Sequence, residues 1–309
     1  MNGQKAIIAL GFSIAIGMSI AWWVNSPSKF PESTGATSAP TNAVRAPKSE
    51  TPTLPTLPPL TAEYLPGFEQ RDPCFSPSLT PDLLSIVFSM AGRAGSGFDL
   101  YESTRSSIDA PFGEPVLLKI TVSPETEAYP AISPNGLELI YLKSDINPEL
   151  WIAKRKSRQE PFQENKRWEG AGKENNSIRL GTPQFLDANR VIFSKLEKNG
   201  ARSLWMSQRS NSKFLPPKLF VKQQGAATLF VSKSGLRAYY PHTDGGLFLV
   251  SRAALSQQYG LPLQLVSKEI TGPVDGTIWI SPQEDVLIYC SPGPQQEIGS
   301  SRRLWQIAF

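Results

Sequence analysis

The sequence predicts an all-β fold, a β-propeller of about five blades, preceded by one N-terminal transmembrane helix and a disordered linker. Three observations predict this organisation. Four short strands separated by turn residues recur about every 51 residues from residue 73 onward. An uncharged apolar run occupies residues 6–24, and a proline-rich stretch separates that run from the first repeat. A six-bladed ring is the alternative count.

Residues 1–4 are expected to form a short cytoplasmic N-terminus, and residues 5–24 a transmembrane signal anchor. After Lys5 come nineteen residues without a charge, just enough to span a bilayer. The run ends in Trp22-Trp23, which suits a membrane interface better than a cleavage site. A cleaved signal peptide is the alternative. The positive charge before the run predicts a cytoplasmic N-terminus and a periplasmic or other extracytoplasmic location for the remainder of this single-pass membrane protein.

Residues 25–59 are expected to be a disordered linker, because eight prolines are interleaved with serine and threonine and large apolar residues are few. A spacer is the preferred interpretation of this stretch, and a proline-rich ligand for another protein is the alternative. The propeller domain is predicted to cover residues 60–309.

The repeat is defined by two sets of positions, one on the first strand and one on the third strand of each unit. The first strand carries an apolar residue, usually followed by serine, at Phe75, Ile132, Phe185, Val231 and Ile280. The third strand carries an aromatic residue after leucine, at Tyr101, Trp151, Trp205, Phe248 and Trp305. We interpret these aromatic residues as packing positions between blades, and a ring that stacks sugars is the alternative.

An arginine follows the third-strand aromatic by four residues in four units, at Arg105, Arg155, Arg209 and Arg252. Phe309 occupies the same place in the fifth unit. Serine, proline and glycine, as in Ser133-Pro134-Asn135-Gly136, are typical of a tight turn between the first two strands. In the first unit we place this turn at Ser76-Pro77.

Two stretches resemble the TolB-like propeller repeat family. One comprises residues 131–141 with Leu150-Trp151 and Arg155, and the other comprises residues 98–105 with residues 111–115. The resemblance extends over residues 70–309 and implies a propeller fold in an exported, membrane-anchored member of the family. TolB has six such blades and binds proteins and peptides in the cell envelope, so the resemblance implies the fold and leaves the partner open.

Composition excludes several classes of site. The one histidine, His242, would have to serve any Ser-His-Asp or Cys-His centre, and a multi-histidine metal centre is excluded. Neither a metal nor a cofactor is predicted. The net charge of +4 is mild, and the only dense basic run, residues 154–158, is expected to be a solvated loop. Nucleic acid is therefore not an expected partner.

No catalytic residues are predicted. The glycine-rich residues 92–97 lack the lysine and hydroxyl residue of a phosphate-binding loop, and no Gly-x-Ser-x-Gly sequence occurs. The leading hypothesis is a non-catalytic binding or scaffolding module for an envelope protein, peptide or glycan. The alternative is a five-bladed glycoside hydrolase, for which Asp72 could supply one carboxylate, with Glu127 and Asp275 as weaker candidates. A structural spacer is a third hypothesis.

Two predictions concern the joint between the first and last units. Cys74 falls on the first strand of unit one, and Cys290 directly follows the second strand of unit five. Those units become neighbours in a closed ring, so the two cysteines form either a disulfide or two buried thiols. The fifth unit has three strands up to Phe309, and an open sheet edge is a liability. Residues 60–66 are therefore predicted to supply its fourth strand by pairing with the strand that ends at Phe309.

Overall fold

The structure is a computed structural model that describes residues 60–71, 74–92, 97–121, 125–144, 147–171, 178–197, 201–211, 213–223, 229–242, 245–274, 277–293 and 302–309. The predicted cytoplasmic N-terminus, membrane anchor and linker, residues 1–59, lie outside these ranges. Within the described residues, no helix has both the length and the apolar character that crossing a membrane requires.

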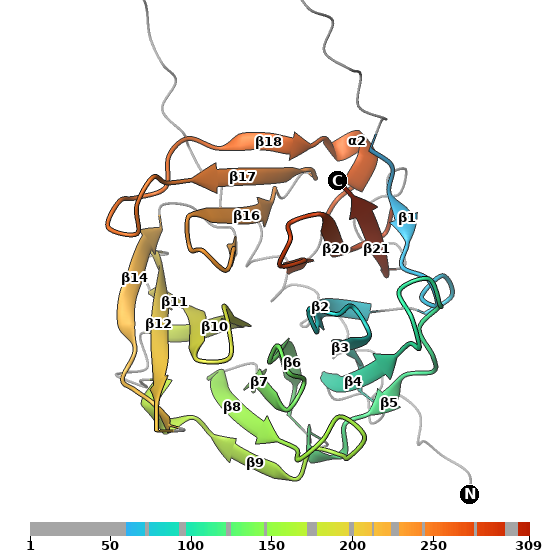
Figure 1. Ribbon diagram of the computed structural model, residues 1–309, viewed down its shortest axis with the longest axis horizontal. Helices are drawn as coiled ribbons and strands as arrows, with labels where there is room; N and C mark the ends of the chain where they lie inside the picture. Colours follow the sequence, from blue (N-terminus) through green and yellow to red (C-terminus); the bar gives the residue numbers. More distant parts are fainter. Residues whose placement is uncertain are drawn as a thin grey trace, which may run out of the picture.

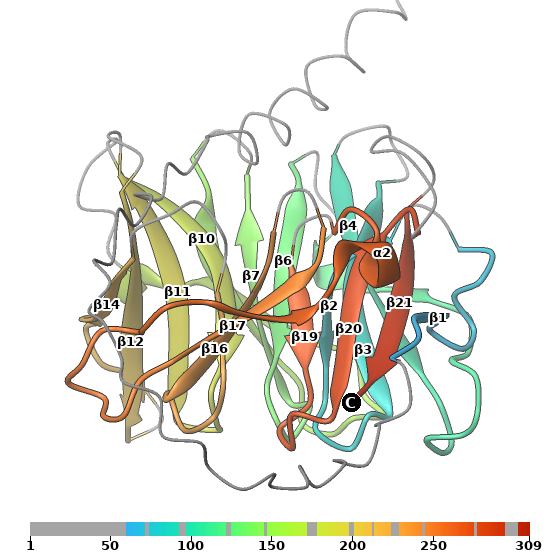
Figure 2. The ribbon, with the colours of Figure 1, turned by 90° about the horizontal axis from the view of Figure 1, so that it is seen from above.

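Five antiparallel sheets surround a central axis, so the chain is a five-bladed propeller (Figures 1 and 2). The first strand of each blade lies nearest the axis. Blade 1 contains β2 (Cys74–Leu79), β3 (Ser85–Ala91), β4 (Phe98–Thr104) and β5 (Val116–Leu117). Blade 2 contains β6 (Glu127–Ile132), β7 (Glu138–Lys143), β8 (Glu149–Lys154) and β9 (Glu164–Arg167). The prediction of five blades is confirmed, and the alternative of six is wrong.

The remaining blades follow the same order, with two departures. Blade 3 contains β10 (Ile178–Phe185), β11 (Arg190–Glu197), β12 (Arg202–Ser210) and β14 (Lys218–Gln223), with the short β13 (Lys213–Phe214) beside β12. Blade 4 contains β15 (Phe230–Val231), β16 (Arg237–Pro241), β17 (Leu247–Ser251) and β18 (Leu263–Val266). Blade 5 contains β19 (Ile278–Ile280), β20 (Val286–Ser291) and β21 (Arg303–Ala308), with β1 (Glu63–Tyr64) as its outer strand. Within the described residues, helical structure is limited to η1 (Lys119–Thr121), η2 (Glu169–Ala171) and α2 (Lys268–Thr271).

The hydrophobic core lies between the blades, because each sheet buries apolar side chains on both of its faces. Five clusters of buried residues correspond to the five joints between adjacent blades. The aromatic residues predicted on the third strands lie directly opposite an aromatic residue of the second strand in every blade, in the pairs Phe88–Tyr101, Tyr141–Trp151, Phe193–Trp205, Tyr240–Phe248 and Tyr289–Trp305. Such cross-strand pairs stabilise a sheet, which agrees with a packing role.

A hydroxyl residue begins the turn between the first and second strands in four blades. In blade 2, the Ser133 amide donates to the Glu138 carbonyl oxygen at 2.8 Å, and the Glu138 amide donates to Ser133 Oγ at 2.8 Å. Ser232 and Ser281 make the same amide bond in blades 4 and 5. In blade 1 the equivalent residue is Thr80, whose amide donates to the Ser85 carbonyl oxygen at 3.0 Å.

The predicted register of the first unit is therefore wrong by four residues. Phe75 lies on the first strand, as expected, but Leu79 is the residue before the turn and so matches Ile132. Ser76-Pro77 lies instead at a bulge of β2, where the pairing with β3 shifts and Ser76 has a φ of 51°. The error has a simple cause, because Thr80-Pro81 presents a second hydroxyl–proline pair four residues later.

The repeated arginines tie the end of the third strand to this turn. Arg105, Arg155 and Arg252 each donate Nε to a turn carbonyl oxygen at 2.7–2.9 Å, and each guanidinium lies over an aromatic ring of the following loop. Arg155 is 8% exposed and also makes a bidentate ion pair with Glu102 of blade 1, at 2.8 and 2.9 Å. The expectation that residues 154–158 form a solvated loop is therefore wrong for Arg155.

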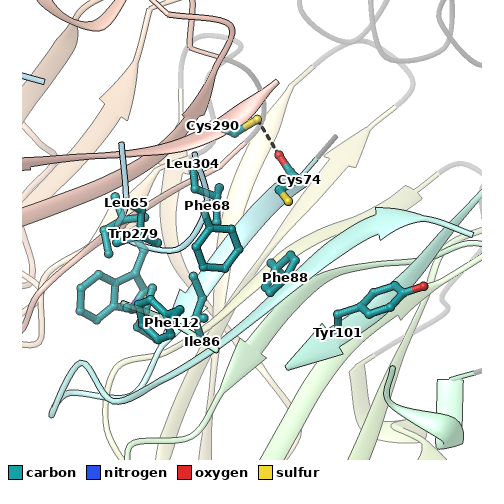
Figure 3. Packing of buried hydrophobic residues seen from close by; sticks show 12 residues of the cluster. Leu65, Phe68, Cys74, Ile86, Phe88, Tyr101, Phe112, Trp279, Cys290 and Leu304 are labelled. Atoms are coloured by element: carbon teal, nitrogen blue, oxygen red, sulfur yellow. Dashed lines mark hydrogen bonds between the residues drawn. The ribbon is translucent and has the colours of Figure 1, made fainter. Parts of the chain in front are cut away.

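The ring closes through residues from both ends of the domain. Glu63 and Tyr64 of β1 pair with Gln306 and Trp305 of β21, which confirms the predicted fourth strand. Beyond β1, Leu65 and Phe68 are fully buried between blades 5 and 1 (Figure 3). The segment that precedes the first blade is thus part of the core.

The two cysteines are both buried in the same joint. Cys290 Sγ donates to the Cys74 carbonyl oxygen at 2.9 Å, whereas Cys74 Sγ points elsewhere and lies 3.6 Å from the Arg71 carbonyl oxygen (Figure 3). A disulfide would require the Cys74 side chain to rotate toward blade 5. The disulfide stays a prediction.

Candidate functional site

A cavity of about 530 Å³ lies on the propeller axis and is lined by the first strands of all five blades. It also includes residues of the five turns between first and second strands, among them Ala188, Lys233 and Gln283, which are exposed. The cavity therefore reaches the surface at the end of the propeller where these turns lie. We call this end the turn face and define it by residues 80–84, 133–137, 186–189, 232–236 and 281–285.

Prolines shape the cavity wall in the first three blades. Pro77, Pro130 and Pro183 each lie at a place where the pairing of the first strand with the second shifts register. Proline has no backbone N–H, so it is tolerated where the ladder is interrupted by a bulge. These bulges leave a wall of apolar proline rings and reduce the number of amide groups that face the axis.

Side chains connect the first strands of neighbouring blades across the wall. Ser78 Oγ accepts a bond from the Ile132 amide at 3.0 Å. Gln184 accepts from the Val231 amide at 2.9 Å and donates to the Val231 carbonyl oxygen at 2.6 Å. Thr182 Oγ1 also lies in the wall, is buried and has no hydrogen-bond partner within the described residues.

The charged residues of the lining are Asp187, Lys233 and Glu284. Asp187 Oδ2 is 2.8 Å from Arg190 Nε. Glu284 Oε2 is 3.0 Å from Arg237 Nε and accepts a hydrogen bond from the Tyr239 hydroxyl, so it links blade 5 to blade 4. Both acids of the cavity are thus held by arginine.

The two carboxyl groups differ in their proton affinity. Burial alone raises the pKa of Asp187, but hydrogen bonds from Asn189 and Arg190 more than reverse this and hold that pKa below its ordinary value. Burial raises the pKa of Glu284, and the positive charge of Arg237 offsets this only in part. One acid of the cavity is therefore held ionised, while the other accepts a proton more readily.

Exposed apolar side chains also lie on the turn face, outside the lining of the cavity. Each lies in the segment that follows a third strand, and that segment is fixed to the turn by a backbone bond such as the Phe309 amide to the Asp285 carbonyl oxygen, 2.8 Å. These side chains come from four blades and are Ile108, Leu215, Leu255 and Phe309, with exposed fractions of 59%, 47%, 52% and 44%. We call these four residues the apolar rim.

Of the three carboxylates considered from the sequence, Glu127 is the one within the described residues. Asp72 and Asp275 fall outside the described residues. Glu127 is at the start of β6, the end opposite the turn face, where it is fully buried and 3.7 Å from Lys143 Nζ. Among the described residues, no group of three or more histidine, cysteine, aspartate or glutamate side chains is suited to holding a metal ion.

The residues that do line the cavity were not predicted from the sequence. Asp187, Lys233 and Glu284 belong to the turns, and in a single sequence they look like ordinary charged turn residues. A usable signal was present at Glu284, because the matching position of the turn is glycine in Gly136 and Gly235.

Comparisons with known proteins show the fold. No protein-family description matches the chain, and no curated protein sequence matches it. TolB from Acinetobacter baumannii is 16% identical in sequence, with a TM-score of 0.47. The superposition covers 77% of this chain, and the chain spans only 55% of the length of that TolB. The α-L-arabinofuranosidase PaAbf62A from Podospora anserina is 13% identical with a TM-score of 0.53, covering 81% of this chain and 96% of its own.

A second enzyme has a similar degree of structural similarity to the chain. The catalytic domain of the GH62 α-L-arabinofuranosidase from Coprinopsis cinerea is 10% identical with a TM-score of 0.51, covering 81% of this chain and 96% of its own. At these identities the similarity extends to the propeller fold alone. The TolB-like family assignment therefore stays a prediction.

Proposed function

We propose that the chain is a non-catalytic binding module that holds its ligand in the cavity of the turn face. The observation that carries this proposal is the cavity itself, which is enclosed by all five blades, walled largely by apolar residues and open where Ala188, Lys233 and Gln283 are exposed. Cavities of a few hundred Å³ with apolar walls and a few polar groups are the usual form of a binding site. Both acids of the cavity form an ion pair with an arginine. This arrangement suits a binding surface better than a catalytic pair of acid and base, whose carboxyl groups must exchange protons with a substrate.

The location of this module is part of the same proposal. We propose that residues 5–24 anchor it in a membrane, with the propeller in the periplasm or another extracytoplasmic compartment. The uncharged run, its terminal Trp22-Trp23 and the positive charge before it support this orientation. The resemblance of the repeats to the TolB-like family is consistent with an envelope protein.

A glycoside hydrolase is the second candidate, and one observation favours it. Asp187 and Glu284 line one cavity, and their pKa values are shifted in opposite directions. Glycosidases use one carboxyl group as a proton donor and a second as a nucleophile or base. The two arabinofuranosidases of the same fold suggest an aryl α-L-arabinofuranoside as the first substrate to test.

The test places a photo-crosslinking amino acid, p-benzoylphenylalanine, at Gln283 of the full-length protein produced in cells. We expect discrete crosslinked products from this position at the cavity mouth. The same amino acid at Lys218, an exposed residue of the outer strand β14, is the control and is expected to give none. Crosslinking from Lys218 but not from Gln283 would exclude the cavity as the binding site.

The purified protein is assayed in parallel with the aryl α-L-arabinofuranoside. No release of the aryl group is expected. Turnover that is lost in Glu284→Gln and in Asp187→Asn would show that the chain is an enzyme and that the binding proposal is wrong.

A further inference from the structure

The charges at the cavity mouth are unequal. Three of the four acids of the turns have an arginine partner, in the pairs Asp82–Arg158 at 2.5 Å, Asp187–Arg190 at 2.8 Å and Glu284–Arg237 at 3.0 Å. The fourth, Asp285, accepts a hydrogen bond from Ser281 Oγ and does not line the cavity. Lys233, the second residue of the blade 4 turn, is exposed and lines the cavity. Within the described part of the chain it forms no ion pair. Of the charged residues that line the cavity, Lys233 is therefore the one without an ion-pair partner in the described part of the chain.

The backbone around Lys233 is held in place by its neighbours. Its carbonyl oxygen accepts a bond from Arg190 Nη2 of blade 3 at 3.2 Å. Ser232 and Ser234 bond to each other at 2.9 Å within the same turn. Lys233 thus projects from a fixed turn, and positioning its charge against a ligand costs side-chain entropy only.

The wall below this charge is apolar. Phe185, Phe230 and Trp279 contribute aromatic surface, and proline rings and aliphatic side chains contribute further apolar surface. Thr182 Oγ1 is the one buried polar atom of this wall that has no partner within the described residues. A ligand matched to this site has an apolar body, a polar group deep in the cavity and an anionic group at the mouth.

The apolar rim indicates how large the ligand is. Ile108, Leu215, Leu255 and Phe309 lie on the same face as the mouth and stay exposed if only the cavity is filled. Exposed apolar residues that flank a pocket are typical of a surface covered by a protein. A small amphiphilic molecule would cover the cavity and leave the rim in water.

We propose that the cavity binds an apolar peptide segment of a protein partner, with a carboxylate of that segment against Lys233 and the body of the partner on the apolar rim. This inference rests on the proposed binding function and specifies the ligand. Lys233 selects an acidic segment, because a charge at the edge of an apolar site contributes more to specificity than to total affinity.

The test uses a random dodecapeptide library displayed on phage, selected against the full-length protein in detergent micelles. The wild-type protein is expected to enrich peptides that combine apolar residues with aspartate or glutamate. Lys233→Glu is expected to enrich lysine or arginine in place of the acid. Lys218→Glu changes charge equally on an outer strand, and it is expected to select the same peptides as the wild type.

The selected peptides are then synthesised and titrated by fluorescence anisotropy. Lys233→Glu is expected to weaken binding of the acidic peptide about tenfold, because attraction is replaced by repulsion. Replacing the acid of the peptide by lysine should restore binding to that variant. Ala188→Trp, at the exposed mouth, should abolish binding, whereas Lys218→Trp should not change it.

The outcomes separate the two proposals. Peptides that bind the wild type and Lys233→Glu equally would overturn the acidic ligand and leave the binding function intact. Binding of decanoate, used as a small amphiphilic carboxylate, without selection of any peptide would overturn the protein partner. Peptide binding that survives Ala188→Trp would show that the cavity is not the site, and the proposed function would fail with it.

Discussion

At one position of the turn between the first and second strands, different residues adopt the same left-handed backbone conformation in different blades. This position has a φ of 61–75° in four blades, where the residues are Leu83, Gly136, Gly235 and Glu284. Glycine adopts this conformation at no steric cost, whereas other residues cost about 1 kcal/mol. Leu83 packs on the core of its joint, and Glu284 contacts Tyr239 and Arg237, so each non-glycine residue gains a contact in return.

Exchanging residues at this position has different expected effects in two blades. Gly235→Ala should lower the free energy of unfolding by about 1 kcal/mol, because alanine is strained at a φ of 73°, and the exposed Leu255 side chain, whose Cδ2 would lie 2.8 Å from the new Cβ, can move aside. Glu284→Gly should stay within about 1 kcal/mol of the wild type, because relief of the backbone offsets the lost contacts. Urea unfolding of the two variants measures both. A larger loss in Glu284→Gly than in Gly235→Ala would mean that the Glu284 carboxylate is required to hold blades 4 and 5 together.

A partly buried carboxylate joins blades 2 and 3 through side-chain ion pairs. The Glu138 carboxylate of β7 forms two ion pairs. One is with Lys154 Nζ of the same blade, at 2.8 Å, and the other is with Arg209 of blade 3. Burial alone raises the pKa of Glu138, but the bonds from Lys154 and Arg209 more than reverse this and hold it below the ordinary value of 4.5. The carboxylate is thus ionised and shared between two blades.

This pair predicts a pH dependence with a definite sign. Because the folded pKa of Glu138 is depressed, its stabilisation is complete above the unfolded value near 4.5 and is lost as pH falls through the folded value. Glu138→Gln should therefore unfold about 1–3 kcal/mol more easily at pH 7, and this difference should shrink below pH 4.5. Denaturant unfolding at pH 7 and pH 3.5 measures the effect. Glu149→Gln, which removes the 3.5 Å ion pair with the exposed Arg167, is the control and should change little at either pH.

The strands could be predicted wherever side-chain pattern and backbone conformation agree. Leucine followed by an aromatic residue located all five third strands, because both residues are required by the packing between blades. The first strand of blade 1 was placed in the wrong register, because Ser76-Pro77 and Thr80-Pro81 have the same pattern. Only the hydrogen bond from the Thr80 amide to the Ser85 carbonyl oxygen distinguishes the turn from the bulge.

At the scale of the whole molecule, closure of the ring depends on a strand of two residues and the segment that follows it. Glu63 and Tyr64 supply the ladder, and the Tyr64 ring lies 4.1 Å from the Trp305 ring between centroids. Leu65 donates its amide to the Leu304 carbonyl oxygen at 2.9 Å, and the Phe112 amide donates to the Pro66 carbonyl oxygen at 2.9 Å. The segment thus bonds to both blade 5 and blade 1.

Truncation separates the closing segment from the linker before it. Deleting residues 1–57 should leave the melting temperature of the propeller nearly unchanged. Deleting residues 1–68 should lower it markedly or prevent soluble folding, because Leu65 and Phe68 are fully buried. In the longer chain, Phe68→Ala should cost about 3–5 kcal/mol. Calorimetry compares the three proteins, and equal stability of the two truncations would show that the segment does not close the ring.

The residues of the cavity were harder to predict from the sequence than the strands, because the cavity exists only in the assembled ring. The cavity is assembled from turns that lie about 50 residues apart, and each contributes one or two residues to it. A carboxylate such as Glu127 resembles Glu284 in the sequence, yet the ring places them at opposite ends of the axis. The position of the mouth follows from the assembled blades, and a single repeat does not contain it.

The closing strand also sets an order of events during synthesis on the ribosome. Residues 63–64 emerge before any blade exists, and their partner strand, residues 303–308, is made after the strands of blades 1 to 4. Blades 1 to 4 each contain a continuous piece of chain and can form as they appear, since domains tend to fold as their residues become available. The joint between blades 5 and 1 stays open throughout this period, with Leu65, Phe68 and Phe88 exposed to other chains. A ribosome that stalls before residue 303 therefore releases a ring with an apolar gap, a form suited to recognition by chaperones.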